Sequence, residues 1–501
     1  MRRLLVALTA LALVAACKTT PEPVPETPPA PPPPEAPAPA PEDGNAFRQE
    51  PPRPGEPPEL VLPKFEQATL DNGLTVLVST RKELPLVYVG MTFAAGGSQD
   101  PKGKGGLADI TYKMLLEGAG GKDTLALDQA FQDLGVSPSV SVNPDGAFVG
   151  TRVLKRNADA ALGLLADVVR KPNFAQKDFE RRKKLQLADL MRAMGSPGFL
   201  AQQAYLNAVF GPEHPYGHPV SGLPATVEPL SLQDVKSFYQ RNVGPKAAGL
   251  VMAGDITLDE AVALAKKSFG DWKGAATPPP VPPAPAALAR QQVVFVPKPG
   301  LDQTVIVMGR PGIAVGHPDE YALELATTVF GGFFGSRLNM NLREDKGYSY
   351  GAGASVDTRL GVGPLTASSA VRSNVTGPAL HEFFQELKGI QERPITQKEL
   401  EAAREGLIRA IPGGFETVEG LGASAAQLFF KRRPLDEFAR TVVGLEKATP
   451  AEVQRVAEAY LGPAAMQVVL VGDPEVIQQQ VGPLELGKLV PQDPVAPPSK
   501  R

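Results

Sequence analysis

Two long stretches of the chain carry regular patterns of apolar and polar residues, and both contain a mixture of strand and helix patterns. Apolar runs rich in β-branched residues predict strands at 74–80, 86–96, 291–297 and 303–309. Apolar residues at helical spacing predict helices at 158–170, 176–195, 199–210, 318–331 and 377–392. The mixture indicates an α+β protein whose helices are layered on mostly antiparallel sheets.

The two stretches end in similar ways. The segment GPKAAGLVMAGD, which starts at Gly244, and the segment GPAAMQVVLVGD, which starts at Gly462, share six of twelve positions. At the same offset upstream, Ser231-x-x-Asp234 corresponds to Thr449-x-x-Glu452, and both are start signals of a capped helix. We infer an internal duplication of a large unit, so the protein should consist of two homologous α/β halves.

Composition predicts where these halves begin and end. The chain has 501 residues, which is more than one hydrophobic core usually spans. Proline-rich segments without core-forming residues favour extended spacers over folded structure. The expected divisions are a targeting segment at 1–17, a proline-rich tether at 18–62, a first half at 63–275, a proline-rich linker at 276–289, a second half at 290–482 and a tail at 483–501.

The first 17 residues have the pattern of a bacterial lipoprotein signal. Arg2 and Arg3 precede a thirteen-residue, mainly apolar run that is too short to span a bilayer comfortably. The run ends in Val-Ala-Ala-Cys, which resembles a lipobox, and Cys17 is the only cysteine of the chain. We expect lipidation at Cys17. By resemblance to Gram-negative lipoprotein sorting, the lysine that follows the cysteine favours the periplasmic side of the outer membrane. The alternative is an ordinary secretory signal with an incidental cysteine.

Charge and composition exclude some classes of function. The net charge of −3 gives no electrostatic case for nucleic-acid binding, and one cysteine excludes an internal disulfide framework. His214 and His218 are four residues apart, but each precedes a proline, so a structural loop is favoured over a metal pair. His317 and His381 carry no site signal.

The segment GLADITYKMLLEG, from Gly106 to Gly118, reads as a short amphipathic helix. Its apolar stripe is Leu107, Ile110 and Met114. We expect Asp109, Tyr112 and Lys113 on its polar side. Asp109, Lys113 and Glu117 are spaced four apart, which favours ion pairs along one face, and Gly118 would cap the end of the helix.

The sequence from Leu70 to Gly118 resembles the opening of the pitrilysin/insulinase family of zinc peptidases, which includes the mitochondrial processing peptidases. The resemblance continues through GPEHPYGHPVSG and the Gly-Asp strand endings, and it covers nearly all of residues 63–480. It implies two homologous α/β halves that enclose a chamber.

Family members that cleave peptides carry H-x-x-E-H on this helix, where two histidines bind zinc and the glutamate activates the metal-bound water. Here those positions are Asp109, Tyr112 and Lys113, and Asp189 best fits the later acidic ligand. A tyrosine is no ready base at neutral pH, and an ammonium group repels Zn²⁺. We therefore expect a degenerate zinc site with no cofactor, in which Lys113 pairs with Asp109, Asp189 or both.

The segment from Gly331 to Val356 resembles the C-terminal signature of the same family. The resemblance implies that Arg343 and Tyr350 bind the substrate backbone and stabilise the oxyanion at the zinc site. The alternative from chemistry alone is that Arg343 only lies in the last turn of a helix, where its charge interacts favourably with the helix dipole, and that Tyr350 is an ordinary aromatic residue of a strand.

This combination predicts a non-catalytic subunit of a periplasmic heterodimeric peptidase. The partner would be a homologous chain that carries zinc on an intact H-x-x-E-H motif, and Arg343 and Tyr350 would act in trans on its peptide substrate. Two alternatives stay open. One is an envelope scaffold or peptide-binding protein, and the other is an autonomous metallopeptidase with an unusual aspartate-based site.

Overall fold

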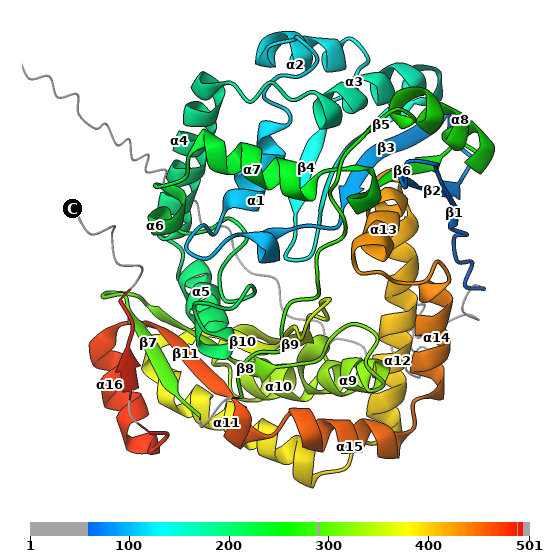
Figure 1. Ribbon diagram of the computed structural model, residues 1–501. Coiled ribbons are helices and arrows are strands. Elements are labelled where there is room, and N and C mark those ends of the chain that lie inside the picture. Colours follow the sequence, from blue (N-terminus) through cyan, green and yellow to red (C-terminus); the bar gives the residue numbers. More distant parts are fainter. Residues whose placement is uncertain (1–58, 288–290, 488, 494–501) are drawn as a thin grey trace, which may run out of the picture. The chain divides into compact units, whose positions relative to one another are not determined.

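The computed structural model describes residues 59–287, 291–487 and 489–493 (Figure 1). From Leu60 onward these residues form one compact unit. Within it the strands form two six-stranded sheets, with the orders β1-β2-β6-β3-β5-β4 and β12-β7-β11-β8-β10-β9. Most neighbouring strands are antiparallel. The parallel pairs are β2 with β6 in the first sheet, and β7 with both β11 and β12 in the second.

The first half contains the first sheet. Its strands are β1 (Glu66–Thr69), β2 (Thr75–Thr80), β3 (Leu86–Phe93), β4 (Ser139–Val142), β5 (Ala147–Leu154) and β6 (Ala248–Gly254). Its helices are α1 (Leu107–Met114), α2 (Thr124–Gln132), α3 (Ala158–Arg170), α4 (Gln176–Ala193), α5 (Pro197–Phe210), α6 (Pro224–Val227), α7 (Leu232–Asn242) and α8 (Leu258–Phe269).

The second half contains the second sheet. Its strands are β7 (Val293–Pro297), β8 (Gln303–Pro311), β9 (Ser349–Val356), β10 (Pro364–Arg372), β11 (Gln467–Gly472) and β12 (Leu489–Pro491). Its helices are α9 (Glu320–Thr327), α10 (Arg337–Asn339), α11 (Thr376–Glu392), α12 (Gln397–Ala410), α13 (Val418–Phe430), α14 (Glu437–Lys447), α15 (Pro450–Tyr460) and α16 (Pro474–Val481). Two π-helical segments, η5 (Thr328–Gly332) and η6 (Met340–Asp345), follow α9 and α10.

The two halves repeat one architecture, as the sequence predicts. The strands β6 and β11 from the repeated Gly-Asp segments take the same place in the two sheet orders. The upstream helices α7 and α15 both begin with a capping box, formed by Ser231 with Asp234 and by Thr449 with Glu452. The predicted α+β class with two homologous halves is therefore confirmed.

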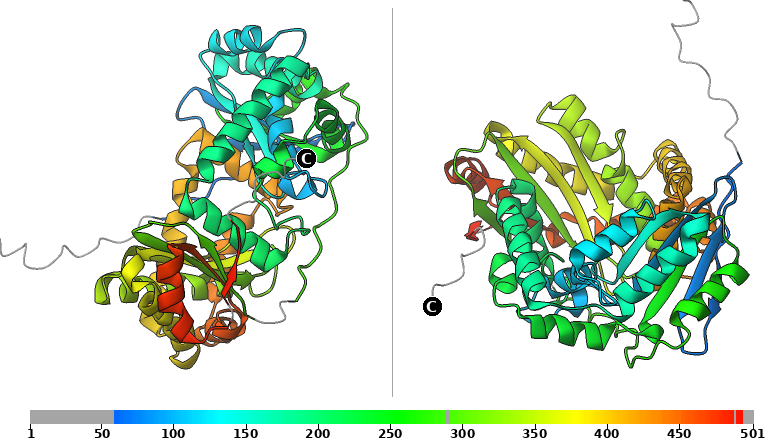
Figure 2. Two further views of the ribbon diagram at one scale, coloured as in Figure 1. Left: turned by 90° about the vertical axis from the view of Figure 1, so that its left-hand side faces the viewer. Right: turned by 90° about the horizontal axis from the view of Figure 1, so that it is seen from above.

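One helix of each half packs on the sheet of the other half. Helix α13 packs on β3 and β6 of the first sheet, and α5 packs on β8 and β11 of the second. Figure 1 shows both contacts, with orange α13 beside the first sheet and green α5 on the second, and Figure 2 shows them from two further sides. Each sheet is thus covered on one face by its own helices and on the other by a helix from the partner half.

This exchange explains why the central strands have continuous apolar sequences. Every residue of β6 and of β11 is buried. A strand that is covered on both faces needs apolar side chains at all positions instead of alternate ones. The two cores beneath the exchanged helices include Leu77, Tyr88 and Val251 for α13, and Val307 and Val469 for α5.

A buried polar network also joins the halves. Asp145, which precedes β5 and is 4% exposed, accepts hydrogen bonds from the hydroxyl of Tyr216 and from the backbone N–H of Leu360 at 2.8 Å. The Tyr216 hydroxyl accepts from the N–H of Gly361 at 3.1 Å. Because an unpaired buried carboxylate is costly, this geometry fixes the β9–β10 connection against the first half.

Helix α13 allows a direct test of the exchange. A Cβ atom added to Gly422 would lie 2.2 Å from Cδ1 of the buried Tyr88. We expect Gly422→Ala to lower the free energy of unfolding by about 1–3 kcal/mol through overpacking. Gly406→Ala is the control, because Gly406 lies in α12 with no heavy atom within 4 Å of its Cβ position. It should raise the free energy by up to ~1 kcal/mol in urea denaturation.

Some sequence predictions need correction or lie outside the described residues. The expected tail from 483 contains β12, which pairs with β7, so the second sheet extends beyond residue 482. The helix expected at 318–331 is α9 followed by π-helical η5. Described residues 276–287 of the expected linker have no helix or strand. The targeting segment with Cys17, and the tether through residue 58, lie outside the described residues.

Among the helices of the described residues, none is both long and apolar enough to cross a bilayer.

Candidate functional site

Helix α1 carries the positions at which the zinc motif would stand, and it lies in the interior of the first half. It contacts α7, α4 and β4 (Figure 1). Asp100 holds its N-terminus, because its two carboxyl oxygens accept from the N–H groups of Gly106 at 2.8 Å and Ala108 at 2.7 Å. Gly106 has φ 94°, a left-handed conformation that favours glycine. The start of the helix is therefore set by residues outside it.

Tyr112 does not lie on a polar side, so that expectation is wrong. Its side chain is fully buried, and its hydroxyl donates to the carbonyl of Ala95 at 2.8 Å. Its ring packs against Phe93 and Phe238, with centroids 5.1 and 6.1 Å away. Burial raises the pKa of the phenol further above its ordinary value. Tyr112 is a core residue and cannot act as a base.

Lys113 pairs with Asp109, which confirms one of the predicted ion pairs. The distance from Nζ of Lys113 to Oδ2 of Asp109 is 2.7 Å. Asp109 is buried, whereas the Lys113 side chain is 37% exposed. Burial raises the pKa of Asp109, and the ammonium group of Lys113 opposes that rise. The ammonium group thus neutralises a buried carboxylate, which would be costly to leave without a partner.

The other predicted partners on this face are arranged differently. Asp189 is 69% exposed and pairs with Arg192 at 3.0 Å, and within the described residues no ion pair joins it to Lys113. Glu117 is buried between Arg181 and Arg182 of α4 instead of pairing with Lys113. Gly118 does not cap α1, which ends at Met114, although its φ of 109° turns the chain there.

These donors do not fit a zinc ion. A metal at this helix would need lone pairs from at least three side chains. Here one position is an ammonium group hydrogen-bonded to the neighbouring carboxylate, and another is a buried phenol committed to a backbone carbonyl. No group of three or more His, Cys, Asp or Glu residues in the described chain is arranged to hold a metal ion.

The histidine pair of the HPYGHP segment is structural. His214 Nε2 lies 3.0 Å from the carbonyl of Pro283, and its Nδ1 accepts from the N–H of Tyr216. His218 Nδ1 lies 3.1 Å from the carbonyl of Pro219. These contacts lie within or beside the loop that carries Tyr216 into the network between the halves, as the structural interpretation predicts.

The second candidate site presents its side chains to solvent. Arg343 lies on π-helical η6, and such segments recur at functional sites. Its guanidinium stacks on the ring of Phe334 at 4.7 Å and its Nε is 3.1 Å from Glu344. Tyr350 lies on β9, an edge strand of the described second sheet, and is 91% exposed. The guanidinium and the phenol, seven residues apart in the sequence, are thus both accessible to solvent.

Helix α11 anchors the segment that carries Arg343. Asn341 donates to Glu382 at 2.9 Å and to Glu386 at 2.8 Å. Lys346, one residue beyond η6, pairs with Glu382 at 3.2 Å. These contacts hold η6 against α11, while the Arg343 side chain stays 43% exposed.

Sequence reasoning missed three residues that shape these sites: Asp100, Phe334 and Asn339. Asp100 precedes a glycine-rich turn and a helix, which is a signal for a non-local helix cap. Phe334 is a large apolar residue that stays 57% exposed, which no sequence pattern indicates. Asn339 is 4% exposed and bonds both the carbonyl of Phe334 and the N–H of Ala352.

Asp100 gives a pH dependence to folding. Burial raises the pKa of its carboxyl from 3.8 to about 8, against the opposing effect of the N–H groups of Ala108 and Gly106. A raised carboxyl pKa means that the unfolded chain releases a proton that the folded chain keeps. Stability should therefore fall as pH rises from about 4 to about 8. Thermal unfolding of Asp100→Asn between pH 5 and 8 should show a smaller decline than the wild type, and an equal decline would contradict the assignment.

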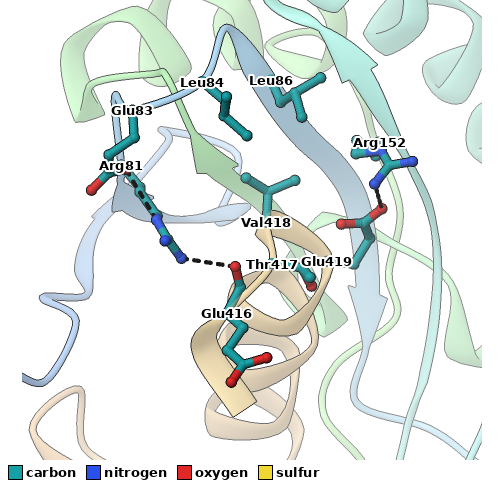
Figure 3. Close-up of a pocket in the computed structure, with 9 residues that line it drawn as sticks. All are labelled: Arg81, Glu83, Leu84, Leu86, Arg152, Glu416, Thr417, Val418 and Glu419. Atoms are coloured by element: carbon teal, nitrogen blue, oxygen red, sulfur yellow. Dashed lines mark hydrogen bonds and ion pairs between the residues drawn. The ribbon is translucent and has the colours of Figure 1, made fainter. Parts of the chain in front are cut away.

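A pocket of about 130 Å³ lies at the junction of the halves (Figure 3). Arg81 crosses the junction and donates to the carbonyls of Phe415 and Glu416, and Arg152 pairs with Glu419. Both arginines bond to the second half beside the start of α13, and Arg81 also pairs with Glu83 of the first half at 3.0 Å, so the pocket lies where α13 is attached. None of the predicted site residues lines it.

Comparisons with known proteins agree with this architecture. A model of the insulinase family, peptidase family M16, matches residues 75–208, and a model described as the peptidase M16 inactive domain matches residues 229–407. An uncharacterized zinc protease of Rickettsia bellii is 24% identical over 341 residues, which cover 68% of this chain and 81% of that protein.

Two solved structures are similar in fold. The peptidase M16 inactive domain from Pseudomonas fluorescens has a TM-score of 0.75 and 25% identity, over 82% of this chain and 98% of that one. A protease from Helicobacter pylori has a TM-score of 0.76 and 21% identity, over 82% of this chain and all of that one. With both family models and the duplicated fold in agreement, the chain belongs to the insulinase family, peptidase family M16, and departs from its zinc motif at Asp109, Tyr112 and Lys113.

Proposed function

We propose that this protein is the non-catalytic subunit of a heterodimeric zinc peptidase. A homologous partner with an intact H-x-x-E-H motif would hold zinc and generate the attacking hydroxide. Arg343 would orient the peptide backbone of the substrate, and the Tyr350 hydroxyl would donate to the oxyanion that forms at the partner's metal. The activity belongs to the pair, and the isolated chain would be inactive.

One observation carries this proposal: the two sites have opposite character. The helix that would bind zinc is closed by the Lys113–Asp109 pair and by the buried Tyr112. Arg343 and Tyr350 instead remain 43% and 91% exposed, on η6 and β9, which bonds to the buried side chains of Glu386 and Asn339 hold in place. A role in folding alone does not account for an exposed arginine and tyrosine on elements that buried polar groups hold in place.

The proposal includes a location. Lipidation at Cys17 would anchor the chain to the periplasmic face of the outer membrane, because several acyl chains on one residue hold a protein stably at a bilayer. The proline-rich segment would act as a spacer of semi-rigid chain. Metabolic labelling with a palmitate analogue tests the anchor, with Cys17→Ser as the variant that should lose the label.

The decisive experiment is a pull-down of the native lipoprotein from solubilised envelopes, with mass spectrometry and elemental analysis. We expect a homologous chain with H-x-x-E-H, one zinc ion per heterodimer, and cleavage of an internally quenched peptide library by the pair only. Stoichiometric zinc and cleavage by the isolated chain would instead establish an autonomous peptidase. A stable partner without any peptidase activity would establish a scaffold or peptide-binding role.

A further inference from the structure

Tyr350 lies in a β-bulge of the edge strand β9. Cross-strand pairing joins Ala352 to Ser369 and then Ser349 to Val371. Tyr350 and Gly351 therefore oppose the single residue Ala370 on β10. A bulge inserts one extra residue, bends the strand and changes the direction of the side chains next to it.

Side chains satisfy the backbone groups that the bulge frees. The hydroxyl of Ser369 donates to the carbonyl of Gly351 at 2.9 Å, and the N–H of Gly351 donates to Oγ of Ser349 at 3.1 Å. The N–H of Ala352 donates to Oδ1 of Asn339 at 3.0 Å. Ser369 and Asn339 are 6% and 4% exposed. Two buried polar side chains from different elements thus fix the irregular backbone at Tyr350.

Asn339 also connects this bulge to the segment of Arg343. Its Nδ2 donates to the carbonyl of Phe334 at 2.6 Å, and the guanidinium of Arg343 stacks on the Phe334 ring. Asn339 is the last residue of α10, so η6 with Arg343 begins at the next residue. One buried amide therefore bonds the strand that carries Tyr350 and the loop that supports Arg343.

Protection of the sheet edge alone does not account for this arrangement. A bulge on an edge strand also prevents pairing with another chain. That role would be served by Ser369 and Ser349 without any bond to the Phe334 loop. The bond from Nδ2 of Asn339 to the carbonyl of Phe334 adds nothing to edge protection, but it ties the loop that supports Arg343 to the strand that carries Tyr350.

We propose that Asn339 and Ser369 are positioning residues that set the geometry of Arg343 and Tyr350 for the substrate. This inference rests on the proposed function, and it adds two residues that touch no substrate themselves. Asn339 acts on both side chains, whereas Ser369 acts on Tyr350 alone. An error of about 1 Å in such a pair can lower the rate a hundredfold.

The test measures peptide cleavage by the purified heterodimer together with ¹⁹F NMR of 3-fluorotyrosine placed at position 350. We expect Asn339→Ala to lower kcat/KM by about ten- to a hundredfold and Ser369→Ala by about tenfold, both with a shifted or broadened fluorine signal. Ser369→Thr keeps the hydroxyl and should retain activity. Asn339→Asp keeps the acceptor for Ala352 and should keep the fluorine signal while it weakens peptide binding.

Controls separate positioning from general damage. Ser368→Ala, at the neighbouring position on β10 where the hydroxyl makes no hydrogen bond within the described residues, should match the wild type. In a Tyr350→Phe background Ser369→Ala should cost little more, because its effect passes through Tyr350. Equal losses in both backgrounds, or an unchanged fluorine signal in Asn339→Ala and Ser369→Ala, would overturn the inference.

The two proposals fail in different ways. If Tyr350→Phe and Arg343→Ala leave cleavage by the pair unchanged, the proposed function is wrong, whatever the fluorine signal shows. If these two variants lose activity while Asn339→Ala and Ser369→Ala keep it, the proposed function stands and the positioning role is wrong.

Discussion

Tyr350→Phe in the reconstituted heterodimer should lower kcat by about a hundred- to a thousandfold with little change in KM. Removal of one oxyanion donor from a peptidase site has an effect of that size, because the lost hydrogen bond forms fully only in the transition state. The folded structure should be unaffected, since the side chain is 91% exposed. Steady-state kinetics on a quenched peptide, with equal zinc content in both preparations, measures this effect.

Arg343→Ala should act on the same reaction in a different way. A guanidinium that orients substrate carbonyls contributes to ground-state binding, so KM should rise along with a fall in kcat.

Tyr348→Phe is the matched control for Tyr350→Phe, because Tyr348 lies two residues before Tyr350 but packs against the core of the second half. Full activity of Tyr350→Phe, or an equal loss in Tyr348→Phe, would contradict the catalytic role in trans.

Restoration of the zinc motif by Asp109→His, Tyr112→Glu and Lys113→His together should unfold the first half or leave it barely stable. Glutamate at position 112 would place a carboxylate in a fully buried site between Phe93 and Phe238. It would also leave the carbonyl of Ala95 without its donor. We expect a loss of more than about 4 kcal/mol in the free energy of unfolding, measured by urea denaturation.

Two smaller changes divide that effect into its parts. Tyr112→Phe removes only the hydroxyl and should cost about 1–3 kcal/mol, since it leaves one buried carbonyl unpaired. Asp109→His with Lys113→His leaves Tyr112 in place and should fold, because both positions lose their charge together. A triple variant with wild-type stability and one bound zinc ion would show that the core tolerates a glutamate at this position. Tyr112 would then not be required for the stability of the first half.

The polar groups of the two candidate sites have different roles. In the first half, the residues at the motif positions of α1 now hold the helix in its core and neutralise a buried carboxylate. In the second half, buried groups such as Asn339 and Glu386 hold a segment whose Arg343 and Tyr350 stay exposed. The polar groups of the first site thus serve folding, whereas those of the second hold elements that present Arg343 and Tyr350 to solvent, as the proposed function requires.

The sequence by itself determined the elements and their duplication. Helix α3 has the predicted bounds, and both capped helices before β6 and β11 begin where the Ser-x-x-Asp and Thr-x-x-Glu signals stand. The Lys113–Asp109 pair was also predictable. These features depend on residues three or four apart or on an unbroken apolar run, so the local spacing of residues contains the necessary information.

Only the tertiary structure decided which surfaces of those elements are buried. The stripe of Leu107, Ile110 and Met114 marks one face of α1, but a helix enclosed by α4, α7 and β4 buries Tyr112 as well. The exchange of α5 and α13, and the pairing of Glu117 with α4, likewise join residues far apart in the chain. The bulge at Tyr350 depends on the register of β9 against β10 and on Asn339. Burial and register are set by neighbours distant in sequence, so no local pattern of residues contains them.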